Sequence, residues 1–413
     1  MKLISTRGNS PAVTISQAID AGLAPDGGLY VPEYFPKYQG GNFDLVTTLA
    51  PFFEGDPLSS SLKEICESAF NFPIPLRNHV LELFHGPTAA FKDVGARFLA
   101  ECQVRLAKEN RTVLVATSGD TGGAVAAAYH GRSHFEVIIL FPKGMVSTRQ
   151  LHQLTCWGGN VRAFAVEGTF DDCQRMAKEA FADPEWKKST TLTSANSINI
   201  GRLLPQMTYY ANASVNYKKN FGVAPGFIIP SGNLGNSVAA LWAKKMGFPI
   251  GKIVMATNAN RSILDYLNTG VNTPHQTIPT LANAMDVGNP SNLERAIHLY
   301  PVMEDLRKDV QAISVSDPEI KETIANGIKD ENIWCPHTAT AVHARKSLPG
   351  NDWIIVATAH PAKFETIVEP LIQQKVVVPP ALSELLSKPS NFTEIKSNLE
   401  SLFAELSGTR KGS

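Results

Sequence analysis

The sequence has neither an excess of charge of one sign nor a long apolar run. Lysine plus arginine and aspartate plus glutamate each number 38 in 413 residues, so the formal net charge is zero. Such a chain has no field that would attract nucleic acid or an anionic membrane. No apolar run approaches the roughly 18 residues of a membrane helix, and the N-terminus lacks the apolar segment of a signal peptide. We therefore expect a soluble cytoplasmic protein that acts on a small molecule, without nucleic acid or membrane as a partner.

Cysteine is scarce, and its spacing excludes two kinds of site. The five cysteines include no CxxC pair, so they frame neither disulfides nor a zinc site and fit a reducing compartment. His130 and His134 lie four residues apart, as two metal ligands on a helix can. Gly131 lies between them, however, and no third ligand is evident. We expect no bound metal.

Two glycine-rich turns occur, and neither matches the dinucleotide motif GxGxxG or the P-loop motif GK[ST]. Each turn has Ser-Gly-Asp or Ser-Gly-Asn between a predicted strand and a helix of small residues, at 118–121 and 231–236. Glycine lets backbone N–H groups converge, and a helix N-terminus carries partial positive charge. The two turns therefore predict two bound anionic groups, one on a cofactor and one on a substrate.

Short β-branched runs alternate with longer helical patterns along most of the chain. This alternation predicts an α/β fold with largely parallel sheets. A chain of 413 residues is too long for one simple core, so we expect two domains. The predicted strands are 111–117, 135–141, 160–166, 226–230, 253–257 and 352–358, and predicted helices include 94–108, 123–131 and 170–182.

The segment 85–93, HGPTAAFKD, places Lys92 after the apolar residues Ala89, Ala90 and Phe91 and just before a predicted helix. Burial lowers the proton affinity of a lysine, because it disfavours the charged ammonium form. The neutral amine is a nucleophile that can form a Schiff base with an aldehyde cofactor. By itself, Phe-Lys-Asp is more typical of a lysine that extends toward water at a helix start. The prediction of a reactive lysine therefore depends on the other motifs.

Together with six further segments in the same order, HGPTAAFKD resembles the threonine synthase family of fold-type II pyridoxal-phosphate enzymes. The resemblance extends along nearly the whole chain, and the long N-terminal segment is similar to the longer bacterial and fungal form. The six segments are 18–32, 117–122, 194–199, 231–236, 284–291 and 358–364.

The resemblance implies a two-domain α/β fold of the tryptophan synthase β type, with the cofactor between the domains. An N-terminal subdomain would precede these domains, and either a monomer or a homodimer is compatible with the sequence. The implied parts are the N-terminal subdomain 1–80, a smaller α/β domain 95–210, a larger discontinuous α/β domain of 81–94 and 211–380, and a C-terminal helical tail 381–413.

The resemblance also implies a carbon–oxygen lyase in the last step of threonine biosynthesis. The family converts O-phospho-L-homoserine and water to L-threonine and phosphate, by γ-elimination and β-addition of water, with pyridoxal 5'-phosphate as cofactor. Lys92 would bind the cofactor and move protons at Cα, Cβ and Cγ of the substrate. The implied cofactor-binding residues are Lys92, Asp120, Gly232, Asn233, Leu234, Gly235, Asn236 and Thr358, and the implied substrate-binding residues are Ser118, Thr121, Asn196, Ser197 and Arg202.

The resemblance gives three of these positions a specific contact. Asp120 would lie near the phenolic oxygen of the cofactor, where two negative charges repel unless one group holds a proton. Arg202 would bind the substrate phosphate, which suits a guanidinium fork, although an isolated arginine is more often part of a surface ion pair. Thr358 would face the pyridine nitrogen. His337 and His360 belong to family-like motifs and are assigned no chemistry.

Three other functions remain open. A serine or threonine dehydratase of the same fold would share Lys92 and the glycine loop but needs no second phosphate site. Asn196, Ser197 and Arg202 therefore discriminate against it. A catalytically silent relative that binds phosphorylated ligands or signals through a partner would lack the lysine, and Lys92 is present. The third alternative is a nucleotide-binding protein without pyridoxal chemistry.

Overall fold

The computed structural model describes residues 1–40, 44–184, 186 and 190–409, and it contains two largely parallel sheets. The larger sheet has the order β11-β10-β9-β12-β4-β3, and only β3 and β4 run antiparallel. Its central strands are near-continuous apolar runs because both faces of the sheet are covered. The strands are β3 (Leu76–Arg77), β4 (Val80–Glu82), β9 (Gly226–Pro230), β10 (Ile253–Thr257), β11 (Val310–Ser314) and β12 (Trp353–Ala357).

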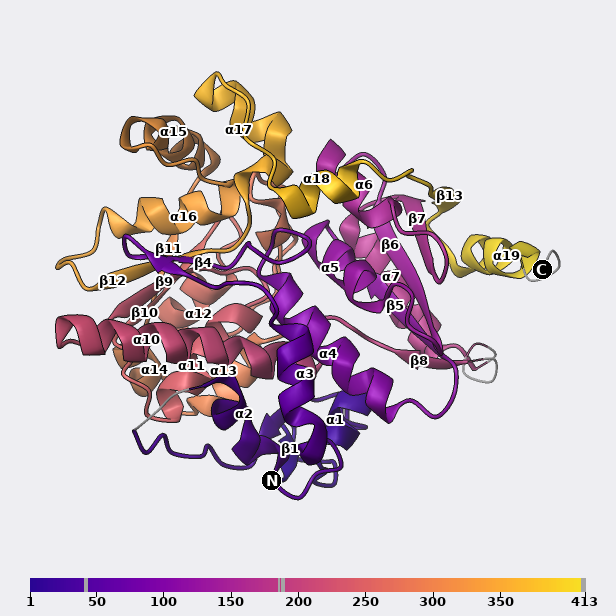
Figure 1. Ribbon diagram of the computed structural model, residues 1–413, viewed down its shortest axis with the longest axis horizontal. Helices are drawn as coiled ribbons and strands as arrows, with labels where there is room; N and C mark the ends of the chain where they lie inside the picture. Colours follow the sequence, from indigo (N-terminus) through magenta and orange to yellow (C-terminus); the bar gives the residue numbers. More distant parts are fainter. Residues whose placement is uncertain (41–43, 185, 187–189, 410–413) are drawn as a thin grey trace.

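Helices cover both faces of the larger sheet (Figure 1). One face shares the main apolar core with α10 (Met207–Phe221), α11 (Gly235–Lys245), α12 (Ser262–Thr269), α13 (Leu293–Leu299) and α14 (Met303–Asp309). The other face packs against α16 (Pro336–Arg345), with α15 (Asp317–Gly327) and α17 (Glu365–Ile372) beyond it.

The smaller sheet has the order β13-β7-β6-β5-β8, with every neighbouring pair parallel. Its strands are β5 (Arg111–Ala116), β6 (Phe135–Pro142), β7 (Val161–Glu167), β8 (Thr191–Thr193) and β13 (Thr393–Lys396). One face carries α4 (Lys92–Leu106), α5 (Asp120–Tyr129) and α6 (Thr148–Thr155), and the other carries α7 (Phe170–Ala182) and α19 (Leu399–Thr409).

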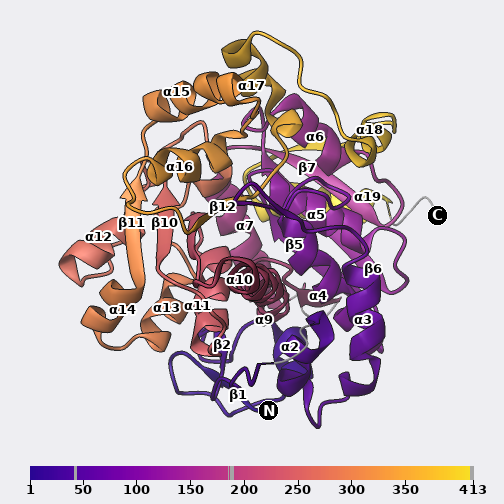
Figure 2. The same ribbon diagram turned by 60° about the vertical axis from the view of Figure 1, so that its left-hand side comes forward.

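The N-terminal segment packs against α4 and closes one end of the molecule (Figure 2). It contains β1 (Leu3–Ser5), α1 (Ile15–Ala21), β2 (Tyr30–Pro32), α2 (Leu45–Phe53) and α3 (Leu62–Ala69). Capping boxes at Thr14 and Asp44 satisfy the first amides of α1 and α2. One continuous apolar cluster joins this segment to one face of each sheet. The two sheets therefore share a core, and α4 lies where they meet.

The predicted α/β fold is confirmed, and the strands 226–230 and 253–257 and the helix 170–182 match to the residue. Two predicted helix starts were too late, because α4 already begins at Lys92 and α5 at Asp120. Both helices therefore start at residues with an implied role. Among the described residues, no helix is both long and apolar enough to cross a membrane.

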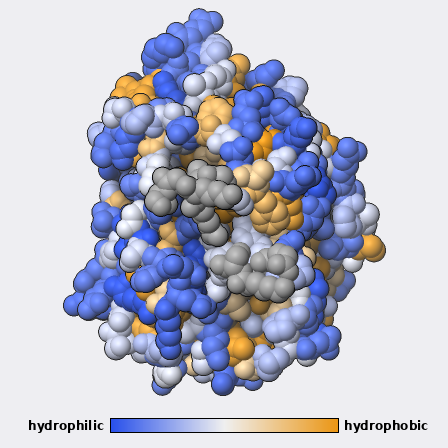
Figure 3. All heavy atoms as spheres, turned by 90° about the vertical axis from the view of Figure 1, so that its right-hand side faces the viewer, coloured by the Kyte–Doolittle hydropathy of each residue, from blue (hydrophilic) through white to orange (hydrophobic). Residues whose placement is uncertain are grey.

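The prediction that 381–413 is a helical tail is wrong in its middle. Between α18 (Pro380–Leu386) and α19, β13 adds a parallel edge strand to β7. The end of the chain thus belongs to the smaller sheet, and residues 410–413 lie outside the described range. The face around α19 is mostly hydrophilic, with apolar side chains in separate patches (Figure 3). At the other end, β3 lies inside the predicted subdomain 1–80 but pairs with the larger sheet.

Candidate active site

Lys92 is partly buried and lies at the junction of the two sheets. The turn before it is bonded to the end of β12. The N–H of Phe91 donates to the carbonyl of Thr358 over 2.8 Å, and the N–H of His360 donates to the carbonyl of Ala89 over 3.0 Å. Ala89 has a φ of 54°, a strained conformation for a residue with a side chain. These bonds bring Lys92 and Thr358 to the same place.

The amine of Lys92 is prepared to act as a nucleophile. Burial lowers its pKa to about 8, and the charges of Arg202 and Lys363 add to this effect while Asp120 opposes it. The Nζ atom lies 4.7 Å from the centre of the Phe91 ring. A substantial fraction of the side chain is therefore neutral near physiological pH, as Schiff-base formation requires.

In the cofactor-free protein, we expect acetylation of Lys92 to rise with pH around a midpoint near pH 8. The ordinary lysine pKa is 10.5, so between about 8 and 10.5 the unfolded chain binds more protons than the folded one. Stability should accordingly rise with pH in that window, and below about pH 8 the cost of burying the charge is fully present. Pulse acetylation with mass spectrometry of the Lys92 peptide measures the midpoint, with the exposed Lys218 as internal reference. A midpoint at the ordinary lysine value would contradict the assignment.

Asp120 is buried and ionised, and a second lysine balances its charge. Its carboxylate lies 2.8 Å from Nζ of Lys363 and accepts a hydrogen bond of 3.0 Å from Nε2 of Gln150. Burial would raise the pKa of Asp120, but the charge of Lys363 and these hydrogen bonds hold it below its ordinary value. The negative charge of Asp120 is therefore balanced by the ammonium group of Lys363, and Asp120 does not hold a proton.

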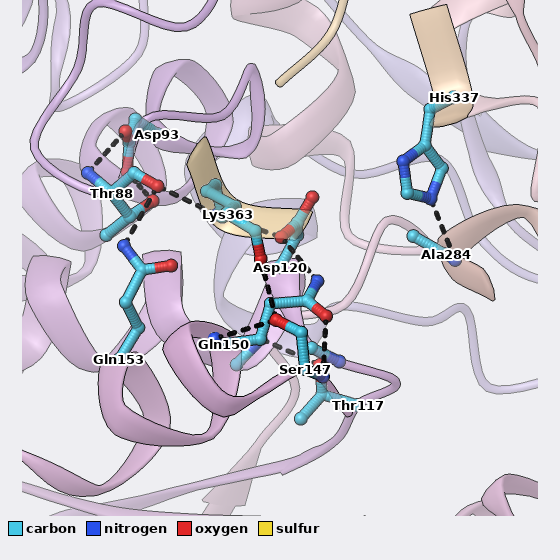
Figure 4. Close-up of polar contacts among 12 residues, drawn as sticks. Thr88, Asp93, Thr117, Asp120, Ser147, Gln150, Gln153, Ala284, His337 and Lys363 are labelled. Atoms are coloured by element: carbon cyan, nitrogen blue, oxygen red, sulfur yellow. Dashed lines mark hydrogen bonds and ion pairs between the residues drawn. The ribbon is translucent and has the colours of Figure 1, made fainter. Parts of the chain in front are cut away.

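Lys363 was missed by the sequence analysis, although it lies within the segment 358–364. It is fully buried in the short helix η5 (Pro361–Phe364), and its Nζ also donates to the carbonyl of Thr88 over 2.7 Å. Thr88 in turn donates through N–H and Oγ1 to Asp93, which follows Lys92. Figure 4 shows this network between the lysine segment, α5 and α6. A lysine in an apolar Ala-Lys-Phe sequence was the available signal, since a buried cation requires a partner.

Arg202 carries a buried charge that forms no ion pair with a described carboxylate. It lies in α9 (Ile200–Leu203) and is 1% exposed. Its Nη1 donates to the carbonyl of Ala195, while its buried Nε has no hydrogen-bond partner among the described residues. Gly95 of α4 permits this placement, because a Cβ there would lie 2.5 Å from the Arg202 carbonyl oxygen. A surface ion pair, the simpler explanation of Arg202, is thereby excluded.

The loop before Arg202 has a second buried polar atom without a hydrogen-bond partner, and side chains from other segments fix the loop. Oδ1 of Asn196 is buried and unbonded within the described part of the chain. Oγ of Ser197 accepts from Nδ2 of Asn233 over 2.8 Å, which links this loop to the turn at 231–236. Arg295, also missed by the sequence analysis, is fully buried and donates to the carbonyls of Ser197 and Ile198. It fixes the loop that carries the polar groups.

The turn 231–236 joins β9 to α11 and is tightly packed. A Cβ on Gly232 would lie 2.6 Å from Cα of Met285, in the short helix η3 (Asn283–Met285). Leu234 has a φ of 61°, again strained. Oδ1 of Asn236 accepts from the hydroxyls of Tyr209 and Tyr210, which leaves its buried Nδ2 without a described partner. An unbonded donor at the start of an 11-residue helix fits a phosphate.

The turn 118–121 differs from its counterpart. Oγ1 of Thr117 accepts hydrogen bonds from the amides of Gly119 and Gly122, over 3.0 and 2.9 Å, so these two donors are already used. Ser118 and Thr121 are partly buried at the start of α5. This turn therefore has fewer free amides for an anion than the sequence similarity suggested.

The remaining sequence candidates have the following contacts. Thr358 is 4% exposed and donates its N–H to Oγ1 of Thr338 over 3.2 Å. Nδ1 of His360 caps η5 by accepting from the amide of Ala362. His130 packs against the Trp157 ring, and His134 bonds to Asn110. Within the described ranges, no group of three or more histidine, cysteine or acidic side chains is arranged to hold a metal.

Between the two largely parallel sheets lie the amine of Lys92, the N-terminus of α11 and the guanidinium of Arg202. This combination defines a fold-type II pyridoxal-phosphate enzyme. The family model "Pyridoxal-phosphate dependent enzyme" matches residues 80–359. The models "Threonine synthase N terminus" and "Threonine synthase, C-terminal" match residues 2–70 and 337–404. The chain belongs to the threonine synthase family.

Similarity to individual proteins extends over the full length. The chain is 38% identical to threonine synthase of Serratia marcescens, covering 97% of this chain and 100% of that one. The crystal structure of threonine synthase from Escherichia coli has a TM-score of 0.91 at 35% identity, covering 99% and 100% of the two chains. The PLP-bound threonine synthase from Brucella melitensis has a TM-score of 0.89 at 33% identity, covering 98% of each chain. Pyridoxal phosphate is accordingly the cofactor of this family, and the residues present fit it.

Proposed function

We propose that the cleft around Lys92 converts O-phospho-L-homoserine and water to L-threonine and phosphate. The observation that carries this proposal is Arg202, a buried guanidinium without an anionic partner among the described residues. Its charge lowers the pKa of Lys92, so it acts on the same site. A buried charge is costly unless it is paired, and a phosphorylated substrate supplies the missing anion. A dehydratase has no phosphate to bind there.

The chain's own residues divide the work between cofactor and substrate. Bound pyridoxal phosphate supplies an electron sink for the carbanion at Cα of the substrate. The amine of Lys92 holds the cofactor and moves protons at the substrate carbons. The amides of Gly232 to Gly235 and Nδ2 of Asn236 hold the cofactor phosphate. Asp120, with Lys363 as its counter-ion, would lie near the phenolic oxygen of the cofactor, and Thr358 would lie near its ring nitrogen.

Arg202, Asn196 and Ser197 hold the substrate phosphate, with Ser118 and Thr121 beside them. Phosphate must first bind as a dianion and then leave from Cγ. A guanidinium fork binds its oxygens and stabilises the charge that develops on the departing group. Asn233 and Arg295 keep the loop of Ser197 in place, which couples the two phosphate sites. We place the protein in the cytoplasm, where its five cysteines, all free and buried, stay reduced.

The test is a substrate comparison with the purified, cofactor-loaded protein. O-phosphohomoserine should give threonine and phosphate in equal amounts, and homoserine without the phosphate should give neither product. Serine and threonine should yield little keto acid. Turnover of serine or threonine to keto acid without reaction of O-phosphohomoserine would assign the protein to the dehydratases instead.

A further inference from the structure

A buried histidine at the site has a hydrogen-bond donor that no described residue accepts. His337 is the second residue of α16 and is 3% exposed. Its Nε2 lies 3.0 Å from the backbone nitrogen of Ala284. Because a backbone N–H can only donate, Nε2 carries no proton, and the neutral ring carries its proton on Nδ1. Nδ1 is buried and has no partner in the described part of the chain.

The ring of His337 stays neutral and acts as a hydrogen-bond donor, without charge. Burial lowers its pKa to about 4; the Asp120 carboxylate opposes this effect, and the charges of Lys92 and Lys363 add to it. Near neutral pH the ring therefore has no second proton to give. Its role is limited to accepting from Ala284 and donating from Nδ1.

The free donor is directed into the site. In Figure 4 the bonded nitrogen of His337 faces Ala284, and the other ring nitrogen lies on the side of Asp120 and Lys363. The Phe364 ring packs against the imidazole with the ring centres 4.9 Å apart, which limits its rotation. The other donors on this side already have partners: Nζ of Lys363 donates to Asp120 and Thr88, and Nε2 of Gln150 donates to Asp120.

We propose that Nδ1–H of His337 donates a hydrogen bond to an anionic oxygen of the molecule bound between Lys92 and Asp120. The identity of that molecule rests on the proposed function. Two oxygens at this place have the required chemistry. One is the phenolic oxygen of the cofactor, and the other belongs to the α-carboxylate of the amino-acid substrate. Next to the Asp120 carboxylate, either oxygen needs a donor, and a neutral imidazole provides one without adding a charge. His337 is thus a binding residue that sequence analysis left without a role.

Two amide variants separate the two nitrogens of His337. Glutamine in H337Q reaches the position of Nε2, so it keeps an acceptor for Ala284 and loses the donor at Nδ1. Asparagine in H337N places an amide N–H near Nδ1 and loses the acceptor. Two titrations are followed by absorbance: pyridoxal phosphate into the cofactor-free proteins, and serine into the loaded proteins. Thermal unfolding of the cofactor-free forms reports the Ala284 bond separately.

H337Q should weaken one of the two ligands by about 10- to 150-fold, the worth of a hydrogen bond to a charged group. Weaker cofactor binding identifies the phenolic oxygen as the acceptor, and weaker serine binding with normal cofactor binding identifies the carboxylate. H337N should retain most of the affinity while melting at a lower temperature. If H337Q binds both ligands like the wild type, or if H337N alone loses affinity, the proposal is wrong and His337 only anchors η3. Neither titration uses O-phosphohomoserine, so failure of the proposed function would be seen separately.

Discussion

Replacing Lys92 with alanine is expected to lower threonine formation from O-phosphohomoserine by about 10⁴-fold or more. The substitution removes both the amine that binds the cofactor and the base that moves protons at the substrate, and a positioned base alone accounts for about 10²- to 10⁴-fold. Asn236 and the amides of the turn 231–236 remain, so the variant should still bind pyridoxal phosphate weakly. Steady-state release of threonine and phosphate measures the first effect, and the absorbance of bound cofactor measures the second.

The matched control is Lys218→Ala, which removes an exposed lysine from α10 and should change neither quantity. The variant Lys92→Arg keeps a positive charge but supplies no amine that could bind the aldehyde. It should be as inactive as Lys92→Ala. Wild-type turnover by either Lys92 variant would show that another group performs the chemistry.

The substitution Arg202→Ala should raise KM for O-phosphohomoserine and lower kcat, with a combined loss of about 10- to 150-fold. That range corresponds to a charge-assisted hydrogen bond worth about 1.5–3 kcal/mol. Both parameters should change, because the guanidinium binds the phosphate and also stabilises it as it leaves. Binding of serine, which has no phosphate, should be nearly unaffected. Steady-state kinetics and a spectral titration with serine give the two numbers for each protein.

A lysine at the same position provides the control. Arg202→Lys keeps the charge and loses the planar fork, so it should recover part of the lost kcat/KM. Because Arg202 also bonds to the carbonyl of Ala195, thermal unfolding must show that both variants are folded. Equal losses with O-phosphohomoserine and serine would mean that Arg202 supports the fold and does not bind the phosphate.

The elements predicted best are those whose signal is local. Strands β9 and β10 are short apolar runs that the main core covers, and α7 begins at a Thr169 capping box and carries an amphipathic pattern. Strand β13, with the sequence TEIK, has no such pattern, since its edge position leaves alternate residues in water. Its pairing with β7 joins distant parts of the chain, and such contacts leave no local trace.

In the candidate site, too, residues in local motifs were predicted and residues defined by long-range contacts were missed. The resemblance named Lys92, Arg202 and the turn 231–236, and the buried unbonded atoms of Arg202, Asn196 and Asn236 lie among the implied residues. Lys363 and Arg295 were missed because their partners are remote; Thr88 is 275 positions from Lys363. Likewise, the internal use of two amides by Thr117 depends on how the turn closes. Which donors stay free for a ligand follows from tertiary contacts and cannot be predicted from motif similarity alone.

Borohydride reduction of the cofactor-loaded protein, followed by peptide mass spectrometry, identifies the lysine that binds the cofactor aldehyde. Two lysines lie in the site, and only one of them is free to react, because Nζ of Lys363 is bound to Asp120 and Thr88. One pyridoxyl group per chain is expected on Lys92, with loss of the yellow colour. A label on Lys363 or another lysine, with Lys92 unmodified, would contradict it.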